Sequence, residues 1–246
     1  DPLALAAVLT SLAAFAGLSV HQRRVDAPFL PRALLANAPY RRIVAMGFLT
    51  TGSNLAALIG LPLLLTRFDG VSAFEVGLVL APGAIMTAVC GVAAGRLVDR
   101  YGARMPTFVG ASLIVVVMLG LSLAAGRSLV AVVALAGVLG GAYSLVNTPL
   151  AATITTLVRP TLLASALSMN IMVFFVGGSF GTTLFVALTQ LDGAAWIPGY
   201  PGPAASFSNA FALFTVPMLV TAGLALTLPR RRQPTPSLSR ETAAAH

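Results

Sequence analysis

The sequence predicts an all-α polytopic membrane protein with about seven transmembrane helices. Its composition is the first observation: 57% of the 246 residues are hydrophobic and 9% are charged, with a mean hydropathy of +0.92. A soluble globular domain carries about 25% charged residues. The second is that the hydrophobic residues form seven long runs, and an α-helix needs about 20 apolar residues to cross a hydrocarbon core. The third is that nearly all arginines fall in alternate connections between these runs.

The first run, residues 3–20, is just long enough to span a membrane. It differs from a signal peptide, because Asp1 stands where a basic segment belongs and the positive charges follow the run. Residues 1–20 are therefore predicted to be an extra or linking transmembrane helix. The chain begins without Met, so we expect upstream sequence in the complete protein. Residues 21–42 carry five arginines and three prolines, which predicts a basic connection at the membrane surface.

Six further runs lie between residues 43 and 228, with short polar connections between them. They cover residues 43–66, 75–94, 106–125, 129–158, 162–190 and 207–228. The run at 129–158 contains Pro149, and residues 191–206 form a loop that is rich in Gly and Pro and has no basic residue. The final segment, 229–246, is basic and polar, and we expect it to be a disordered tail.

The fifteen basic residues are all arginines, and alternate connections divide them 13 to 2. The larger group is Arg23, Arg24, Arg32, Arg41, Arg42, Arg96, Arg100, Arg104, Arg159, Arg230, Arg231, Arg232 and Arg240. The smaller group is Arg67 and Arg127. Cytoplasmic loops of membrane proteins carry the excess of positive charge. The division therefore predicts that the basic connection and the C-terminal tail are cytoplasmic, and it supports the count of seven spans.

The same arginines account for the net charge of +8 without a nucleic-acid partner, because they lie between apolar runs and not on a soluble surface. One cysteine, Cys90, and two distant histidines, His21 and His246, provide no metal-binding spacing. No Ser/His, Asp/Asp or His-rich catalytic set lies within the runs, so we expect neither an enzyme nor a bound cofactor. The absence of lysine beside many Ala and Arg residues indicates a GC-rich bacterial genome, and hence the bacterial inner (plasma) membrane.

A charged segment between the runs at 75–94 and 106–125 carries a specific pattern. It reads Gly-x-Leu-x-Asp-Arg-x-Gly-x-Arg, and all six positions are filled, by Gly95, Leu97, Asp99, Arg100, Gly102 and Arg104. The pattern resembles the cytoplasmic loop signature of the major facilitator superfamily of secondary transporters. In that family the loop joins the second and third helices of a six-helix half.

The resemblance implies that residues 43–228 are one C-terminal six-helix half built from inverted three-helix repeats, whose partner is a missing N-terminal half. The stretch Arg23-Arg24-x3-Pro28-Phe29-Leu30-Pro31-Arg32-x-Leu34-Leu35 and the run from Glu75 to Ala84 resemble the fourteen-helix drug:proton antiporters. In that branch the chain would be the C-terminal half plus one extra helix. The alternative is a twelve-helix member in which the first span is the sixth helix.

The implied function is secondary active transport of a small molecule by alternating access. Proton-coupled efflux of drugs or amphipathic small molecules, driven by the proton gradient, is the leading hypothesis. A buried carboxylate is the usual proton carrier, but Asp69 and Glu75 lie at the outer ends of spans and no acid lies at a span midpoint. The alternatives are an importer of a nutrient or metabolite and a non-transporting truncated fragment.

The charged segment is expected to act as a gate. Gly95 and Gly102 permit a tight turn and close helix approach. Asp99 suits the N-terminus of a neighbouring helix, while Arg100 and Arg104 suit carboxylates or backbone carbonyls. In the family this cluster latches the two halves together on the cytoplasmic side, so its partner here would be a helix of the missing half. The alternative is that its arginines only anchor the topology.

Polar residues within the spans predict a substrate cavity. The family lines its cavity with the first, fourth and fifth helices of each half, and the corresponding candidates are Thr51, Asn54, Tyr143, Asn147 and Asn170. Each amide could instead form a hydrogen bond between helices.

Glycines and prolines within the spans predict close packing and bends. The candidates are Pro82, Gly83, Gly140, Gly141, Pro149, Gly177, Gly178 and Gly181. Glycines that recur at three- and four-residue intervals make a flat strip along which helices approach and slide, and prolines interrupt helical hydrogen bonding.

Overall fold

The computed structural model describes residues 34, 36–68, 70–191, 196 and 204–228, together with Thr10. Within these residues every regular element is an α-helix. The helices are α3 (Ala38–Phe68), α4 (Ala73–Tyr101), α5 (Arg104–Ala124), α6 (Leu129–Leu157), α7 (Pro160–Thr189), α8 (Ala205–Leu213) and α9 (Thr215–Ala225). The predicted first span, most of the basic connection and the tail lie outside the described residues.

Six helical segments of the described chain are long and apolar enough to cross a membrane. Five of them are α3 to α7, and the sixth is Ala205–Ala225, which contains α8 and α9. The chain is therefore an all-α, multi-pass membrane protein, as its sequence predicts.

Local sequence sets several helix ends. The Ser72 hydroxyl accepts a hydrogen bond from the Glu75 N–H (3.4 Å), and the Glu75 carboxylate accepts one from the Ser72 N–H (2.8 Å). This reciprocal capping box satisfies two N–H groups at the start of α4. The Ser128 hydroxyl caps α6 in the same way by accepting from the Ala131 N–H. Two connections turn through glycines in the left-handed region, Gly70 and Gly126, both at φ 62°.

Three features of the helices differ from the sequence-based expectation. α4 continues beyond residue 94 to Tyr101, so most of the charged segment is helical and its turn contains only Gly102 and Ala103. Arg and Leu favour helix, and leaving the hydrocarbon does not by itself end one. α6 passes through Pro149 without ending. The last span is broken at Phe214, because Pro217 offers no N–H to the carbonyl one turn earlier.

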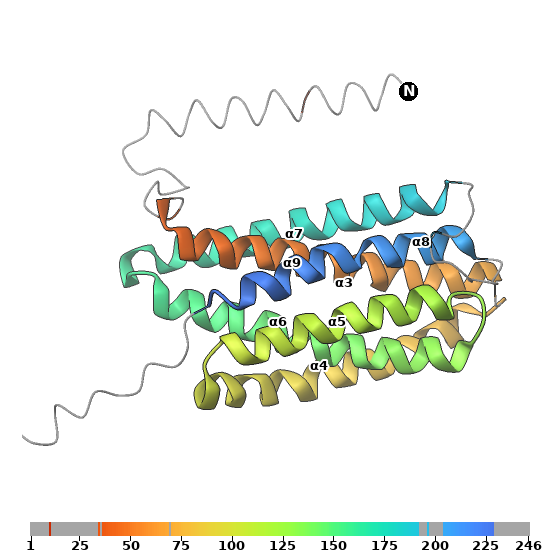
Figure 1. The fold of residues 1–246 in the computed structure, drawn as a ribbon, viewed down its shortest axis with the longest axis horizontal. Coiled ribbons are helices and arrows are strands. Elements are labelled where there is room, and N and C mark those ends of the chain that lie inside the picture. The colour runs from red at the N-terminus through yellow and green to blue at the C-terminus, as the bar shows by residue number, and fades with distance from the viewer. Residues whose placement is uncertain are drawn as a thin grey trace, which may run out of the picture.

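The helices lie side by side and form two triplets, the first three spans and the last three (Figure 1). The main packing partner of each helix in the first triplet belongs to the second triplet. α3 packs chiefly against α7, and α4 packs chiefly against α6. α5 lies against both α6 and α9. The first helix of each triplet thus packs on the second helix of the other, which is the reciprocal arrangement that inverted three-helix repeats produce.

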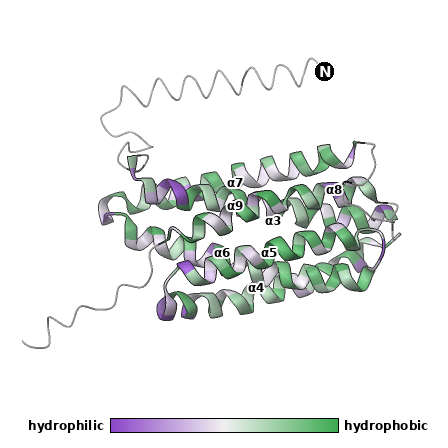
Figure 2. Cartoon of the chain, in the orientation of Figure 1, coloured by the Kyte–Doolittle hydropathy of each residue, from purple (hydrophilic) through white to green (hydrophobic). Residues whose placement is uncertain are grey.

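Charge separates the two ends of this bundle. α3, α5 and α7 begin at one end, where α4, α6 and α9 finish (Figure 1). This end, which we call the arginine-rich end, carries Arg41, Arg42, Arg96, Arg100, Arg104 and Arg159, whereas Arg67 and Arg127 belong to the opposite end. Apolar residues occupy the lengths of the helices between the two ends (Figure 2). The described arginines therefore divide in the way the whole sequence predicts.

Aromatic packing fastens the last span to α7. The buried ring of Phe185 lies 6.2, 4.9 and 5.9 Å, centroid to centroid, from Phe207, Phe211 and Phe214. Tilted and edge-on pairs at such distances are favourable beyond the apolar area that they bury. The cluster holds α8 and the start of α9 in place despite the break between them.

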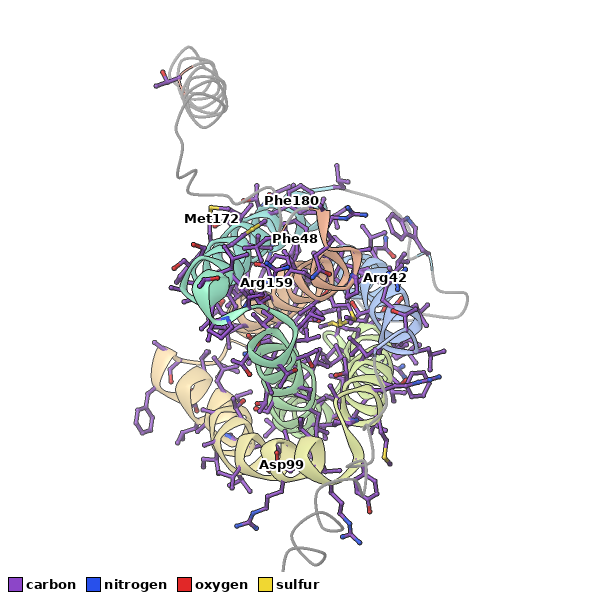
Figure 3. The ribbon with its side chains drawn as sticks, turned by 90° about the vertical axis from the view of Figure 1, so that its left-hand side faces the viewer. Arg42, Phe48, Asp99, Arg159, Met172 and Phe180 are labelled. Atoms are coloured by element: carbon purple, nitrogen blue, oxygen red, sulfur yellow. The ribbon has the colours of Figure 1, made fainter. Side chains whose placement is uncertain are left out.

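The helices are not equally covered. The difference is clear in the most apolar stretch of each span. In α4 11% of the residues in this stretch are buried and in α7 22%, whereas in the other four spans 44% to 56% are buried. α4 (yellow) and α7 (teal) lie at opposite ends of the cross-section of the bundle (Figure 3). These two helices therefore expose most of their apolar surface in the described chain.

Candidate functional site

A cavity of about 360 Å³ lies between α3, α4 and α6. Most of its wall is aliphatic, and three side chains supply polar atoms: Asn54 from α3, Thr87 from α4 and Tyr143 from α6. The remaining lining residues are Leu58, Leu61, Leu80, Gly83, Ala84, Ala136, Leu139 and Gly140. An apolar pocket with a few convergent polar groups is the usual form of a small-molecule site.

The three polar side chains meet at the same depth in the bundle. Asn54, Thr87 and Tyr143 each lie at or next to the middle of their helices, which run over residues 38–68, 73–101 and 129–157. Because these helices span the full length of the bundle, the cavity is midway between its two ends. No acidic or basic residue is among the described residues that line it.

Hydrogen bonds hold two of the three polar groups. The Tyr143 hydroxyl is hydrogen-bonded to the Thr51 hydroxyl of α3. The Thr87 hydroxyl donates to the Gly83 carbonyl (2.8 Å), and the buried Ser144 donates to the Thr87 carbonyl (2.7 Å) across the α4–α6 contact. The Asn54 amide forms no such bond with the residues that the structure describes. Its donor and acceptor are therefore the groups best placed to bind a molecule in the cavity.

The structure brings three of the five predicted cavity residues together. Asn54 and Tyr143 line the cavity, and Thr51 positions the Tyr143 hydroxyl. Asn147 lies one turn beyond Tyr143 on α6, partly buried and outside the lining. Asn170 is on α7, and its amide oxygen would lie 3.6 Å from a Cβ added at Gly47 of α3. Neither of these two amides lines the cavity.

The sequence interpretation missed Thr87. It assigned the cavity to the first, fourth and fifth helices of the half, and so it ignored α4, the second. A signal was present, because Thr87 follows Gly83 by one helical turn and places a hydroxyl on the face where a glycine permits close approach.

Backbones meet at two glycine crossings, and the one between α4 and α6 forms part of the cavity wall. Where α3 crosses α7, a Cβ added at Gly52 would lie 2.9 Å from the Gly177 carbonyl, and one at Gly181 would overlap the Gly52 carbonyl. Where α4 crosses α6, a Cβ at Gly83 would lie 2.8 Å from the Ala136 carbonyl. Contacts under 3.0 Å leave no room for a side chain. Each crossing joins the first helix of one triplet to the second helix of the other, α3 to α7 and α6 to α4. The two crossings therefore occupy corresponding positions in the two triplets.

The other glycine and proline candidates lie around these crossings. A Cβ at Gly140 would overlap the Gly83 carbonyl, and one at Gly177 would lie 2.7 Å from the Phe48 carbonyl. Gly178 and Gly141 are close to the side chains of Leu55 and Cys90, respectively. Pro82 precedes Gly83 in α4, and Pro149 is inside α6.

The family model described as Major Facilitator Superfamily matches residues 3–182 and residues 70–246 of the chain. Together these matches cover nearly its whole length. The chain belongs to the major facilitator superfamily. Members of this family are transporters, and the six spans that the structure describes correspond to one half of such a protein.

Two curated relatives of this facilitator chain are similar at low identity. Multidrug resistance protein Stp of Mycobacterium tuberculosis is 27% identical over 180 residues, which is 72% of this chain and 32% of Stp. An uncharacterized MFS-type transporter, YhcA of Bacillus subtilis, is 27% identical over 110 residues, which is 45% of this chain and 21% of YhcA. The matched part thus spans a third or less of each relative.

The facilitator signature lies at the arginine-rich end, at the junction of α4 and α5. Gly95, Leu97, Asp99 and Arg100 occupy the last turns of α4, and Arg104 opens α5. Asp99 is exposed, on the side of the bundle away from Phe48 and Phe180 (Figure 3).

The two glycines of the signature have different surroundings. Gly102 makes the turn at φ 79° and ψ 173°, a conformation essentially restricted to glycine, and its N–H donates to the Val98 carbonyl (2.8 Å). Gly95 is inside α4, with open space where a Cβ would be. Of the two glycines expected to form a turn and a close approach, only Gly102 is required by the geometry of the described chain.

Glu75 caps α4 at the opposite end of the bundle and is fully exposed. Among the residues that the structure describes, no group of three His, Cys, Asp or Glu side chains could hold a metal ion. The midspan cavity is the candidate functional site, and Asn54 is one of the polar residues in its wall.

Proposed function

We propose that this chain is one half of a secondary active transporter that exports amphipathic small molecules by alternating access. The observation that carries the proposal is the midspan cavity, with its aliphatic wall and the Asn54, Thr87 and Tyr143 side chains. Such a wall accepts the apolar part of a substrate, and the amide and hydroxyl groups orient its polar part. The name of the relative Stp, a multidrug resistance protein, agrees with a substrate of this class.

We propose that the other half of the transporter packs on α4 and α7 and closes the cavity from that side. α4 and α7 are the least covered spans of the described chain. Their exposed side chains are large and apolar and include Leu78, Ile85 and Phe175. A second six-helix half would cover both helices at once and complete the wall.

The proposed energy source is the proton gradient. Proton-coupled transport generally needs a carboxylate within the membrane. In this chain the acidic residues are Asp1, Asp26, Asp69, Glu75, Asp99, Asp192 and Glu241, and none lies at the middle of a span. The proton-carrying group is therefore assigned to the other half, and this half contributes substrate contacts and the gate.

The test is drug accumulation in a bacterial host that lacks its own efflux pumps. Cells that express the full reading frame should accumulate less of a fluorescent amphipathic dye, and a protonophore should abolish the difference. Asn54→Ala should raise the dye concentration needed for half-maximal export about five- to tenfold, because it removes hydrogen bonds worth about 1–1.5 kcal/mol.

Thr66→Ala is the matched control, since Thr66 is an exposed hydroxyl residue near the C-terminal end of the same helix and outside the cavity. It should export like the unmodified protein. Equal export by Asn54→Ala and Thr66→Ala would contradict the assignment of the cavity as the substrate site. Unchanged dye accumulation on expression, at verified membrane insertion, would contradict export itself.

A further inference from the structure

A second hollow, of about 390 Å³, lies on the surface between α3 and α7, near the arginine-rich end. We call it the α3–α7 groove. Its lining residues are Tyr40, Arg41, Val44, Ala45, Phe48, Leu49, Met169 and Val173. Those on α3, from Tyr40 to Leu49, extend over about 14 Å at 1.5 Å per residue. The groove shares no lining residue with the midspan cavity, and Figure 3 shows Phe48 on the opposite side of the bundle from Asp99.

The walls of the groove are apolar. Its one phenol, on Tyr40, donates its hydroxyl to the Ala166 carbonyl of α7 (2.8 Å), so this polar atom is used in joining the two helices. The Phe48 ring lies 6.0 Å from the ring of Phe180, which is exposed on α7. In a bilayer such an apolar surface faces lipid, and an apolar groove along a span can accommodate an acyl chain.

The charge of the groove is at one end only. Arg41 lies in the first turn of α3, next to Tyr40, and Arg42, the next residue, is exposed at the same end (Figure 3). No acidic residue is among the described residues that line the groove. The cations therefore lie where the hydrocarbon region gives way to headgroups, and the apolar walls continue from them toward the middle of the membrane.

We propose that the α3–α7 groove binds one anionic phospholipid. Its acyl chain lies along Ala45, Phe48 and Val173, and its phosphate is held by Arg41, with Arg42 adding positive charge. Basic pockets between transmembrane helices bind anionic headgroups in this way. A zwitterionic lipid offers the same acyl chain but no net charge, so the arginines make the site selective for the anionic one.

The test uses the full chain in vesicles that contain a trace of photoactivatable phosphatidylglycerol or, in parallel, phosphatidylcholine with the same chains. Phosphatidylglycerol should label peptides that contain residues 41–49 and 169–173 several-fold more than phosphatidylcholine does. Arg41→Gln and Arg42→Gln should each reduce that labelling about fivefold, since a basic residue near an anionic membrane contributes about 1 kcal/mol. Arg96→Gln is the matched control and should leave it unchanged, because Arg96 is an exposed arginine of α4 at the same end.

A second variant tests the apolar part of the site. Ala45→Trp fills the groove while both arginines remain, and it should reduce labelling at 169–173 at an unchanged elution volume and melting temperature. Equal labelling by the two lipids, or unchanged labelling of Arg41→Gln, would overturn the proposal. It would also be overturned if neither lipid labelled the groove. Crosslinking of Ala45→Cys to a cysteine placed within residues 3–20 would then identify the chain itself as the occupant.

Discussion

Gly181 and Gly223 are both glycines within helices, but they have different surroundings. A Cβ at Gly181 would overlap the Gly52 carbonyl of α3, whereas one at Gly223 of α9 would meet no atom within 4 Å. Gly181 thus allows two backbones to touch, and Gly223 costs helix stability without a packing reason. Composition alone does not distinguish the two residues, because the distinction depends on which helix passes nearby.

We expect Gly181→Ala to destabilise the protein by about 1–3 kcal/mol, because α7 must move away from α3 to make room for the methyl group. Gly223→Ala should be neutral or stabilise by up to about 1 kcal/mol, since alanine is the better helix former. Thermal unfolding of the two purified variants in one detergent measures the difference. Equal melting temperatures would show that the crossing tolerates a methyl group.

The sequence predicted part of the candidate site because some polar residues are conspicuous within apolar spans. Asn54 and Tyr143 stand out for this reason, and both line the cavity. Thr87 was overlooked because threonine is common in helices, where its hydroxyl often bonds to its own backbone, as here to Gly83. Asn170 is as conspicuous as Asn54, and only the packing of α7 on α3 shows that it lies outside the cavity.

The α4–α5 junction is an element in which a helix, a turn and a charge cluster overlap. The charged segment looks like a loop in the sequence because charges end the apolar run. In the structure, however, α4 continues to Tyr101, and the Arg100 guanidinium lies 5.3 Å from the centre of the Tyr101 ring. The chain reverses its direction within two residues, Gly102 and Ala103. Arg96, Asp99 and Arg100 therefore lie on the last turns of a helix and not in a loop.

The two glycines of this junction should respond differently to the same substitution. Gly102→Ala forces a side chain into a backbone conformation that only glycine adopts readily, at a cost of about 1–3 kcal/mol. Gly95→Ala places a methyl group in open space and should be tolerated in the isolated chain. Thermal stability of the two variants, compared in detergent, checks the prediction. A loss of stability in Gly95→Ala of equal size would show a contact that the described helices do not provide.

Asp99→Asn tests the proposed gate, because it keeps the side-chain shape and removes the charge. Losing a contact of about 1–2 kcal/mol should shift the balance from outward- toward inward-facing states by roughly five- to thirtyfold. Export by the complete transporter should fall sharply with little change in substrate affinity, since Asp99 lies far from the midspan cavity. Arg96→Gln, outside the six signature positions, is the control.

Asp99→Asn and the control Arg96→Gln are compared at equal expression in a dye-export assay and a cysteine-accessibility assay from the cytoplasmic side. Normal export by Asp99→Asn would leave the signature as an anchor of topology only.

Helix ends were harder to predict from sequence than helix positions. The six predicted runs coincide with the six spans, because length and hydropathy follow directly from the thickness of a membrane. The ends of α3 and α4 extend beyond the apolar runs, since a helix continues into the headgroup region when no breaker is present. The break at Phe214 follows from Pro217, whereas Pro149 does not break α6. Proline alone therefore does not predict an interruption.

The distribution of arginines predicts how the whole molecule is oriented in the membrane. Six of the eight described arginines belong to one end of the bundle, which we propose to be cytoplasmic. Thr161 and Leu191 test this well, because both are exposed and they stand at opposite ends of α7 and its continuation.

In a Cys90→Ala background, Leu191→Cys should react with a membrane-impermeant maleimide on intact cells. Thr161→Cys should react only after the cells are made permeable. Reaction of Thr161→Cys on intact cells, with Leu191→Cys protected, would reverse the orientation.

Because helices of one triplet pack on helices of the other, some helices are made well before their main packing partners. Of the described helices α3 is made first, but its main neighbour is α7, and Gly177 follows Gly52 by 125 positions in the chain. At a synthesis rate of about 5–20 residues per second, α3 waits about 6–25 s for that neighbour. α6 is made before α7, but for most of this interval the Thr51 hydroxyl and the Asn54 amide have neither helix to pack against. The nascent chain must therefore be sheltered, by the insertion machinery or by earlier helices, until its fifth described helix enters the membrane.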